Sequence, residues 1–148
     1  MPKIDFYLLE ESSMPHRLDF ACRLIEKAYK HKHRIYVHVE NVNDAHLLDE
    51  KLWTYRDDSF LPHHIQGEGP EPAPPIQIGY TKAPEKARDI LLNLSFNVPE
   101  FYPQFKRILE IVINAPEAQN KAREHYREYR SKGFDIQTHH LQNGSKTE

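Results

Sequence analysis

Short apolar runs alternate with longer amphipathic stretches in the first part of the chain. Residues 4–9 form an apolar, aromatic-rich run whose length and composition are typical of a buried strand. A helix is predicted from Pro15, because apolar residues recur there at helical spacing while charged residues take the other positions. The apolar positions are Leu18, Ala21, Cys22, Ile25, Ala28 and Tyr29. These two elements predict a helix packed against a sheet.

A second strand and a second helix follow in the same order. Residues 34–39 are predicted as a strand, and Asn41 and Asn43 are candidate N-caps of the next helix. That helix is expected to carry Ala45, Leu48, Leu52 and Trp53 on one side. The repeated order of strand and helix predicts an α/β domain with a partly parallel sheet.

From Asp57 the hydrophobic pattern becomes irregular. The prolines and glycines of residues 67–75 predict a surface loop inside the domain. Further elements are predicted as strands at residues 76–80, 89–94 and 108–113 and a brief helix at residues 99–105. The chain therefore resumes a strand-rich pattern after the loop.

A long helix is predicted near the end of the chain, over residues 116–132, with Gly133 in the C′ position. A last extended piece follows near residues 135–139. The expected fold class is three-layer α/β/α with a mostly parallel or mixed sheet, formed by one domain over residues 1–141. The polar residues 142–148 are expected to form a mobile tail.

The composition supports one folded domain without a strongly basic surface. The chain has 148 residues, of which 39% are hydrophobic and 28% are charged, enough for a real core in a single domain. The 20 Lys and Arg residues against 22 Asp and Glu residues give a net charge of −2, so no global positive field exists to hold a phosphate backbone. Contact with nucleic acid is therefore expected to be local or made through a partner.

Cys22 is the only cysteine, which excludes an internal disulfide and a Cys-based zinc site and favours a reducing cytoplasm. It falls on the apolar side of the first helix, so a structural role is favoured over a nucleophilic one. The first residues do not resemble a signal peptide, and no apolar run reaches the ~18 residues of a membrane span. We expect a cytoplasmic protein that is neither secreted nor embedded in a membrane.

The sequence contains no motif that predicts a catalytic, cofactor or metal site. It has no G-x-x-x-x-G-K-[ST], and the turn after the first strand carries Glu10 and Glu11 instead of the glycines that approach a phosphate. The ten histidines lack H-E-x-x-H spacing, so surface or hydrogen-bonded roles are favoured over a zinc site. The alternative function is a small hydrolase acting on a nucleotide or phosphate ester, because α/β folds of this kind host many activities.

Two aromatic residues, Trp53 and Phe60, lie at a predicted helix end and in the loop after it, next to Leu61 and Pro62. Aromatic side chains near a surface are typical anchors of protein interfaces. The other interpretation is that both rings cover the core beside the sheet. Composition alone favours neither.

The last predicted helix carries its arginines together on one side. Arg123, Arg127 and Arg130 fall on one ridge, with Tyr126 between that ridge and the face expected on the sheet. The residues expected on the sheet are Ala118, Ala122 and Tyr129. Five cations against three glutamates make this helix +2. Guanidinium groups bind carboxylates bidentately, so the ridge suits a carboxylate-bearing ligand. The other interpretation is that the ridge is a solvated helix face without a ligand.

Five motifs together resemble the chi subunit family of bacterial DNA polymerase III. They are F-Y-L-L at residues 6–9, L-D-x-x-L-W at 48–53, S-F-L-P-H at 59–63, R-D-I-L-L-N-L at 88–94 and A-R-E-x-Y-R-x-Y-R-x-x-G-F at 122–134. They occur in the family's order over about residues 3–141. The resemblance implies an α/β fold like that of nucleotide-binding domains, without the nucleotide site, cofactors or catalytic activity of its own.

The resemblance also implies partners. Chi proteins pair with the psi subunit, which tethers them to the clamp loader, and they bind the acidic C-terminal tail of single-stranded DNA-binding protein. The implied tail site comprises Arg123, Tyr126, Arg127 and Arg130, with Gly133 and Phe134 nearby. In it, Arg123 would clamp the terminal carboxylate of the tail. The implied psi interface comprises Trp53, Phe60, Leu61 and Pro62, and in some relatives the aromatics face an accessory helicase. Contact with DNA would be indirect.

The chain departs from the family pattern in two places. Residues 114–117 form a segment about three residues shorter than in some relatives, and Gln119 stands where some relatives carry an additional lysine. Lys121 is the cation that could replace the missing charge. A third hypothesis, direct binding of single strands by basic and aromatic residues, predicts retention on DNA without a protein partner, and little is expected at physiological salt.

Overall fold

The computed structural model describes residues 2–56, 60–69, 72–86 and 88–141, and the predicted tail at residues 142–148 lies outside this part. The strands are β1 (Lys3–Leu9), β2 (Ile35–His38), β3 (His63–Ile65), β4 (Ile76–Gly79), β5 (Ile90–Asn93), β6 (Arg107–Val112) and β7 (Asp135–Leu141). The helices are α1 (Met14–Lys30), α2 (Val42–Thr54) and α3 (Pro116–Ser131), with a 3-10 turn, η1 (Tyr102–Gln104).

The seven strands form one sheet in the order β3-β4-β2-β5-β6-β1-β7, and every pairing is parallel. The α/β class is confirmed, and of the two sheet types expected the described strands form the parallel one. Strand β3 corrects one prediction, because the hydrophobic pattern predicts an irregular segment at residues 63–65. This strand is three residues long, holds two histidines and pairs only with β4, so its own sequence has too little periodicity to reveal it.

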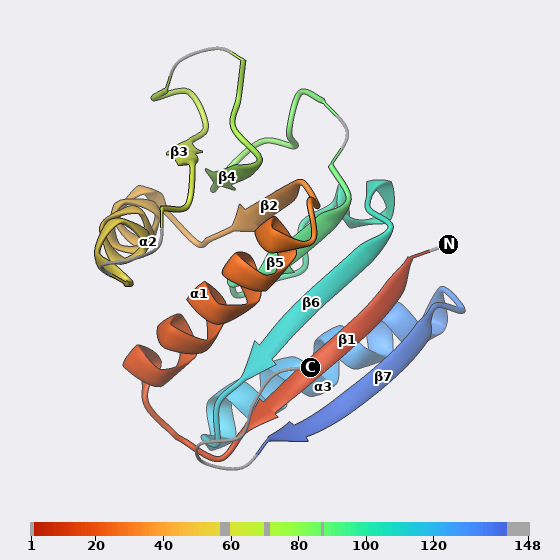
Figure 1. The fold of residues 1–148 in the computed structure, drawn as a ribbon. Coiled ribbons are helices and arrows are strands. Elements are labelled where there is room, and N and C mark those ends of the chain that lie inside the picture. The colour runs from red at the N-terminus through yellow and green to blue at the C-terminus, as the bar shows by residue number, and fades with distance from the viewer. Residues whose placement is uncertain (1, 57–59, 70–71, 87, 142–148) are drawn as a thin grey trace.

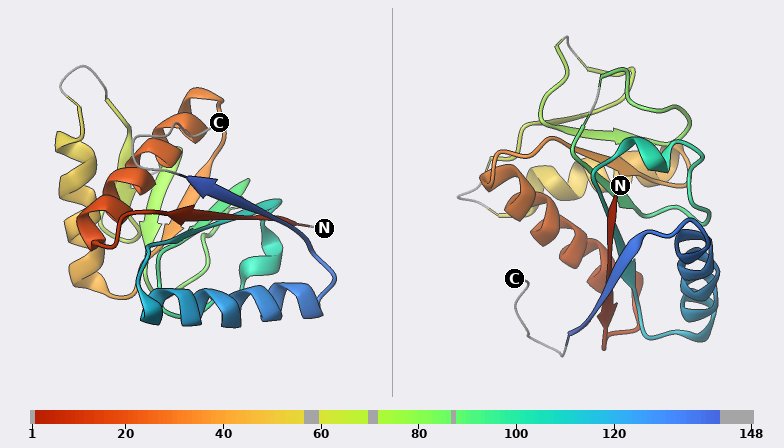
Figure 2. Two further views of the ribbon diagram at one scale, coloured as in Figure 1. Left: turned by 90° about the horizontal axis from the view of Figure 1, so that it is seen from below. Right: turned by 90° about the vertical axis from the view of Figure 1, so that its right-hand side faces the viewer.

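The sheet lies between two helical layers, which confirms the three-layer architecture. Helices α1 and α2 cover one face, and α3 and η1 lie on the other (Figures 1 and 2). Strand residues alternate between the two cores, as Tyr7 and Leu9 pack with α1 while Phe6 packs with α3. Both faces are covered, which explains why the strands read as nearly continuous apolar runs.

The predicted helix signals have clear structural counterparts. The Asn41 side chain accepts a hydrogen bond from the Asp44 backbone N–H at 2.9 Å and so caps α2. Cys22 is fully buried in α1, and burial raises the pKa of its thiol to about 12, as expected for a structural cysteine. One expectation for α2 is wrong: Trp53 is 54% exposed and does not share the buried side of Leu48 and Leu52.

Gly79 provides a test of packing between β2 and β4. A Cβ atom at this position would overlap the hydroxyl and ring of Tyr36, which is fully buried. We expect Gly79→Ala to lower the free energy of unfolding by about 1–3 kcal/mol, the usual cost of overpacking a core. Urea denaturation measures this change. Stability equal to that of the unsubstituted protein would mean that the Tyr36 ring has room to move.

Candidate functional site

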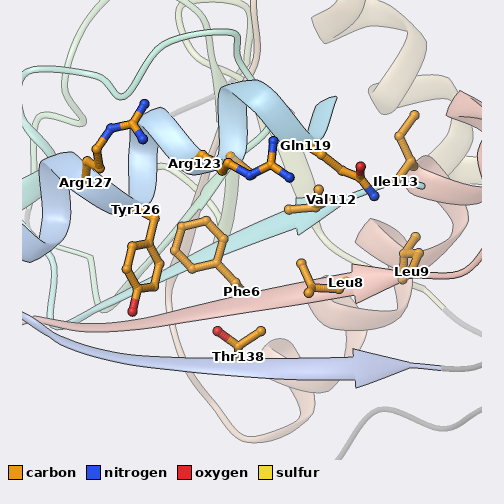
Figure 3. A pocket seen from close by; sticks show the side chains of 11 residues that line it. Phe6, Leu8, Leu9, Val112, Ile113, Gln119, Arg123, Tyr126, Arg127 and Thr138 are labelled. Atoms are coloured by element: carbon orange, nitrogen blue, oxygen red, sulfur yellow. The ribbon is translucent and has the colours of Figure 1, made fainter. Parts of the chain in front are cut away.

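A cavity of about 390 Å³ lies between α3 and strands β1, β6 and β7, and we call it the α3 groove (Figure 3). Its lining residues are Phe6, Leu8, Leu9, Val112, Ile113, Gln119, Ala122, Arg123, Tyr126, Arg127 and Thr138. Three separate strands and one helix therefore build it. The groove extends toward the carboxyl ends of β1 and β6, where parallel α/β sheets commonly bind ligands.

The floor of the α3 groove is apolar. Phe6 and Leu8 lie two residues apart on β1 and therefore point to the same face of the sheet, beside Val112 of β6. The Phe6 ring packs against Tyr126, with 5.9 Å between the ring centroids. These floor residues were missed as site residues. The alternation along β1 indicated a common face, but it did not indicate that α3 leaves part of that face open.

Two arginines of α3 lie on the helix side of the α3 groove. Arg123 and Arg127 are both exposed, and neither lies within 4 Å of a carboxylate of the described residues. The Arg123 guanidinium donates to the Asn120 side-chain oxygen at 2.7 Å. In Figure 3 it extends along the helix beside Gln119, whereas Arg127 points away from Phe6. The site thus combines an apolar floor with two positive groups, neither of which forms an ion pair with a described carboxylate, and Arg127 interacts with the Glu124 carboxylate only at longer range.

The other residues of the predicted tail site lie around the groove. Arg130 is one turn further along α3 and approaches the Tyr126 hydroxyl at 3.4 Å. Gly133 adopts a positive φ of 79° and ends α3, as predicted, because a left-handed residue is needed there. Phe134 packs edge-on against Tyr102, with ring centroids 5.8 Å apart. Gly133 and Phe134 therefore fix the helix end and do not line the groove.

Lys121 does not replace the missing lysine in the α3 groove. Its ammonium group lies 4.0 Å from the centroid of the Phe96 ring and 3.0 Å from the Glu124 carboxylate, on the other flank of α3. It lines a second cavity of about 400 Å³ with Arg17 and Glu40. Gln119, at the position where the sequence resemblance implies a lysine in some relatives, is uncharged and lines the groove.

A buried polar network attaches α3 to the sheet behind the groove. The Glu110 carboxylate on β6 accepts hydrogen bonds from His125 Nδ1 at 3.0 Å, from the Tyr129 hydroxyl and from the Asn93 amide at 3.1 Å. All four side chains are buried. Burial and the neighbouring Glu110 charge raise the pKa of Tyr129, so the phenol remains a donor. The network sets the position of α3 and hence of Arg123.

His125 was not singled out by its sequence position, yet its surroundings define its charge state. Nδ1 faces the Glu110 carboxylate, and Nε2 lies 2.9 Å from the backbone oxygen of Phe96. Both neighbours are acceptors, and only the imidazolium can donate from both nitrogens. Burial acts to lower the pKa of His125, but the hydrogen bond and charge of Glu110 outweigh it and raise the pKa above 6.5.

The His125 pair predicts a dependence of stability on pH. Because the folded-state pKa is raised, its contribution is complete below about pH 6.5 and is lost as the pH rises through the folded-state value. We expect the free energy of unfolding of the unsubstituted protein to decrease over that pH interval. The His125→Gln protein should not show this decrease. Urea denaturation of both proteins between about pH 5.5 and 9 isolates this difference, and parallel curves for the two proteins would contradict the assignment.

A second candidate surface lies on α2 and the segment after it. The Trp53 and Phe60 rings are 54% and 66% exposed, and their centroids lie 5.8 Å apart. Leu61 is buried in the core and anchors this segment, and Pro62 is half-buried between Leu61 and β3. The two rings therefore form an exposed aromatic pair and do not cover the core, which contradicts one of the two interpretations left open above, while their role in an interface stays a prediction.

The two candidate surfaces lie at opposite edges of the sheet. Helix α2 packs beside β3 and α3 beside β7, and these strands are the first and last of the sheet (Figure 1). The aromatic pair and the α3 groove therefore face separate regions of solvent. One molecule has room for two partners at these surfaces at the same time.

No group of three or more His, Cys, Asp or Glu side chains in the described ranges is placed to hold a metal ion. None of the described helices combines the length and apolar character needed to cross a membrane.

The fold and the site define a class: an α/β protein with a fully parallel sheet among its described strands, a cationic groove beside one edge and an aromatic pair at the other. Comparison with known proteins identifies the family of the chain. The family model described as "DNA polymerase III chi subunit, HolC" matches residues 1–137. The chain belongs to the chi subunit family of DNA polymerase III, an accessory subunit family of DNA replication, which confirms the resemblance seen in the sequence motifs.

Curated relatives cover nearly the whole chain. DNA polymerase III subunit chi of Pseudomonas aeruginosa is 36% identical over 141 residues, which are 95% of this chain and 98% of the relative. The chi subunit of Escherichia coli K12 is 30% identical over 143 residues, covering 93% of this chain and 97% of the relative. The chi subunit of Haemophilus influenzae is 28% identical over 137 residues, covering 92% and 95%.

Proposed function

We propose that this chi-family protein is a noncatalytic adaptor of the bacterial replisome, located in the cytoplasm. The α3 groove binds the acidic C-terminal tail of single-stranded DNA-binding protein. The aromatic pair Trp53 and Phe60 binds the psi subunit, and through psi the clamp loader. An accessory helicase is a second candidate for the aromatic pair. Contact with DNA is indirect, in keeping with a net charge of −2.

The chemistry of the α3 groove supports the first part of this proposal and is the observation that carries it. A peptide that ends in acidic residues and an apolar side chain carries negative charge and a terminal carboxylate. Neither Arg123 nor Arg127 forms an ion pair with a described carboxylate, and guanidinium groups bind carboxylates bidentately. The floor of Phe6, Leu8 and Val112 offers an apolar surface for the last side chain.

The separation of the two surfaces supports the second part. An adaptor must hold two partners at once, and the aromatic pair and the α3 groove lie at opposite edges of one sheet. Exposed aromatic residues are among the strongest anchors of protein interfaces. The proposal therefore assigns psi to one edge and the acidic tail to the other.

Arg123→Ala tests the groove. We expect it to weaken binding of a short peptide with acidic residues before an apolar C-terminal residue by about 10-fold or more, because it removes a charge-assisted hydrogen bond. Fluorescence anisotropy with a labelled peptide measures the affinity. Binding should also weaken as salt rises, since the charges are partly exposed.

Arg56→Ala is the matched control, because Arg56 is an exposed arginine near α2, far from the α3 groove along the sheet. It lowers the net charge by the same amount and should leave the peptide affinity within about twofold. Equal affinities for the Arg123→Ala and Arg56→Ala proteins would rule out the groove as the tail site.

A further inference from the structure

A third cavity, of about 380 Å³, lies at the β3–β4 end of the sheet, at the same edge as the aromatic pair but on the opposite face. Gln77 of β4 lines it and is paired in register with Tyr36, so the cavity lies on the face of the sheet that α3 covers elsewhere. The residues that line it come from segments before β2, between β3 and β4, after β4 and before β5. We call it the β4 cavity.

Positive charge is concentrated around the β4 cavity. Its lining includes the cations Arg34, Lys82, Lys86 and Arg88, and Glu85 is the one carboxylate among its described lining residues. Among the described lining residues, four positive charges less one negative charge leave +3, in a chain whose net charge is −2. Such a local excess favours an anionic ligand.

Arg88 is the most deeply buried of these four cations. It is only 5% exposed, and its Nη1 atom donates to the backbone oxygens of Pro75 at 2.7 Å and, more weakly, Ile35 at 3.5 Å. No carboxylate of the described residues lies within ion-pair distance of it. Burial, together with the nearby Arg34 charge, lowers the pKa of Arg88 to about 10. A buried cation beside another cation is unfavourable unless an anion compensates both.

The walls of the β4 cavity are held in place by specific hydrogen bonds. The Tyr36 hydroxyl donates to the Lys82 carbonyl and lies 3.2 Å from Gln66 Oε1, while Gln66 Nε2 donates to the Ala83 carbonyl at 3.0 Å. Arg34 Nη2 donates to the Ala73 carbonyl at 3.1 Å. These bonds fix the backbone of the segment after β4 and the side chain of Arg34, so this part of the cavity is arranged before any ligand arrives.

A buried polar atom is also left unpaired in this cavity. Gln77 is 6% exposed, and its Oε1 atom has no hydrogen-bond partner among the described residues, although Nε2 lies 3.0 Å from His64 Nε2. An unpaired buried acceptor costs free energy that a ligand or bound water recovers.

We propose that the β4 cavity is a binding site for the phosphoryl groups of a small phosphorylated ligand. Two guanidinium groups and two ammonium groups match the several oxygens and the multiple charge of a phosphate or diphosphate better than the single charge of a carboxylate. The volume suits a small molecule. This site uses no glycine-rich phosphate loop, so the absence of that motif does not argue against it.

Isothermal titration calorimetry with pyrophosphate, at low salt, tests the proposal. We expect Lys82→Gln/Lys86→Gln to weaken binding by about 3- to 10-fold, because two exposed charge pairs are lost, and Arg88→Met to weaken it further. The control Lys106→Gln/Lys132→Gln removes two exposed lysines elsewhere and should bind as the unsubstituted protein does. The lysine variant decides the question should Arg88→Met fail to fold.

Other anions identify the source of the phosphoryl group. Tighter binding of ADP than of pyrophosphate would support the proposal with a nucleotide as the ligand, and equal binding would support it with the diphosphate alone. Acetate binding as tightly as pyrophosphate would overturn the assignment to phosphate. Equal affinity for pyrophosphate in the two double-lysine variants would overturn the location. Neither result depends on the α3 groove or the aromatic pair.

Discussion

Glu110→Ala is expected to lower the free energy of unfolding by about 3–5 kcal/mol, the range found when one partner of a buried ion pair is removed. The substitution leaves the His125 imidazolium without its counter-charge inside the protein. It also removes the acceptor of the Tyr129 hydroxyl and of the Asn93 amide. Urea denaturation near pH 6, where His125 is protonated in the folded protein, gives the largest effect.

Glu100→Ala is the matched control, because Glu100 is an exposed carboxylate before η1. We expect a change within about 0.5 kcal/mol, as for most surface substitutions. Glu110→Gln should fall between the two, since it keeps acceptor capacity but loses the charge. A Glu110→Ala protein as stable as the Glu100→Ala protein would show that the network contributes nothing to stability.

Trp53→Ala is expected to weaken binding of the psi subunit by about 2–4 kcal/mol, or roughly 30- to 1,000-fold. Its ring is half exposed and contacts both Phe60 and His63, so the free protein already holds it in place. A positioned aromatic ring loses little conformational entropy on binding, which favours a large contribution. Titration calorimetry with purified psi measures the change.

Phe96→Ala serves as the control for Trp53→Ala. Phe96 is another exposed aromatic residue, 52% accessible, but it lies after β5 beside Lys121 and Glu40, and not at the C-terminal end of α2 that carries Trp53. Its removal should leave the psi affinity within about threefold. If Trp53→Ala and Phe96→Ala bind psi equally well, the aromatic pair is not the psi interface. The peptide affinity of the α3 groove should be unaffected by Trp53→Ala, because the two surfaces lie at opposite edges.

Most helices and strands were predictable because hydrophobic periodicity is a local property. Helix α3 shows this well, as its predicted end at Gly133 coincides with the positive φ that glycine adopts readily. Strand β3 was missed for the opposite reason. Its three residues become a strand only because β4 offers them backbone partners, and nothing within them indicates that pairing.

The candidate site was predictable in part. Helical spacing placed Arg123 and Arg127 on one ridge, and both line the α3 groove. The floor residues Phe6 and Leu8 could not be assigned to the site from the sequence, because an apolar strand residue is equally typical of the buried core. The pairing of Glu110 with His125 joins β6 to α3 across 15 positions, and no spacing rule connects residues on different elements.

Residue type and spacing along single elements were enough for the α/β class, the order of most elements, the family and the sorting of arginines on the last helix. Three further properties required the packed chain. Every described strand pairing is parallel, Trp53 and Phe60 are exposed, and Arg88 is buried beside Arg34 without a described counter-charge. Strand pairing, exposure and charge compensation depend on which distant segments come together, and that is settled when the elements pack.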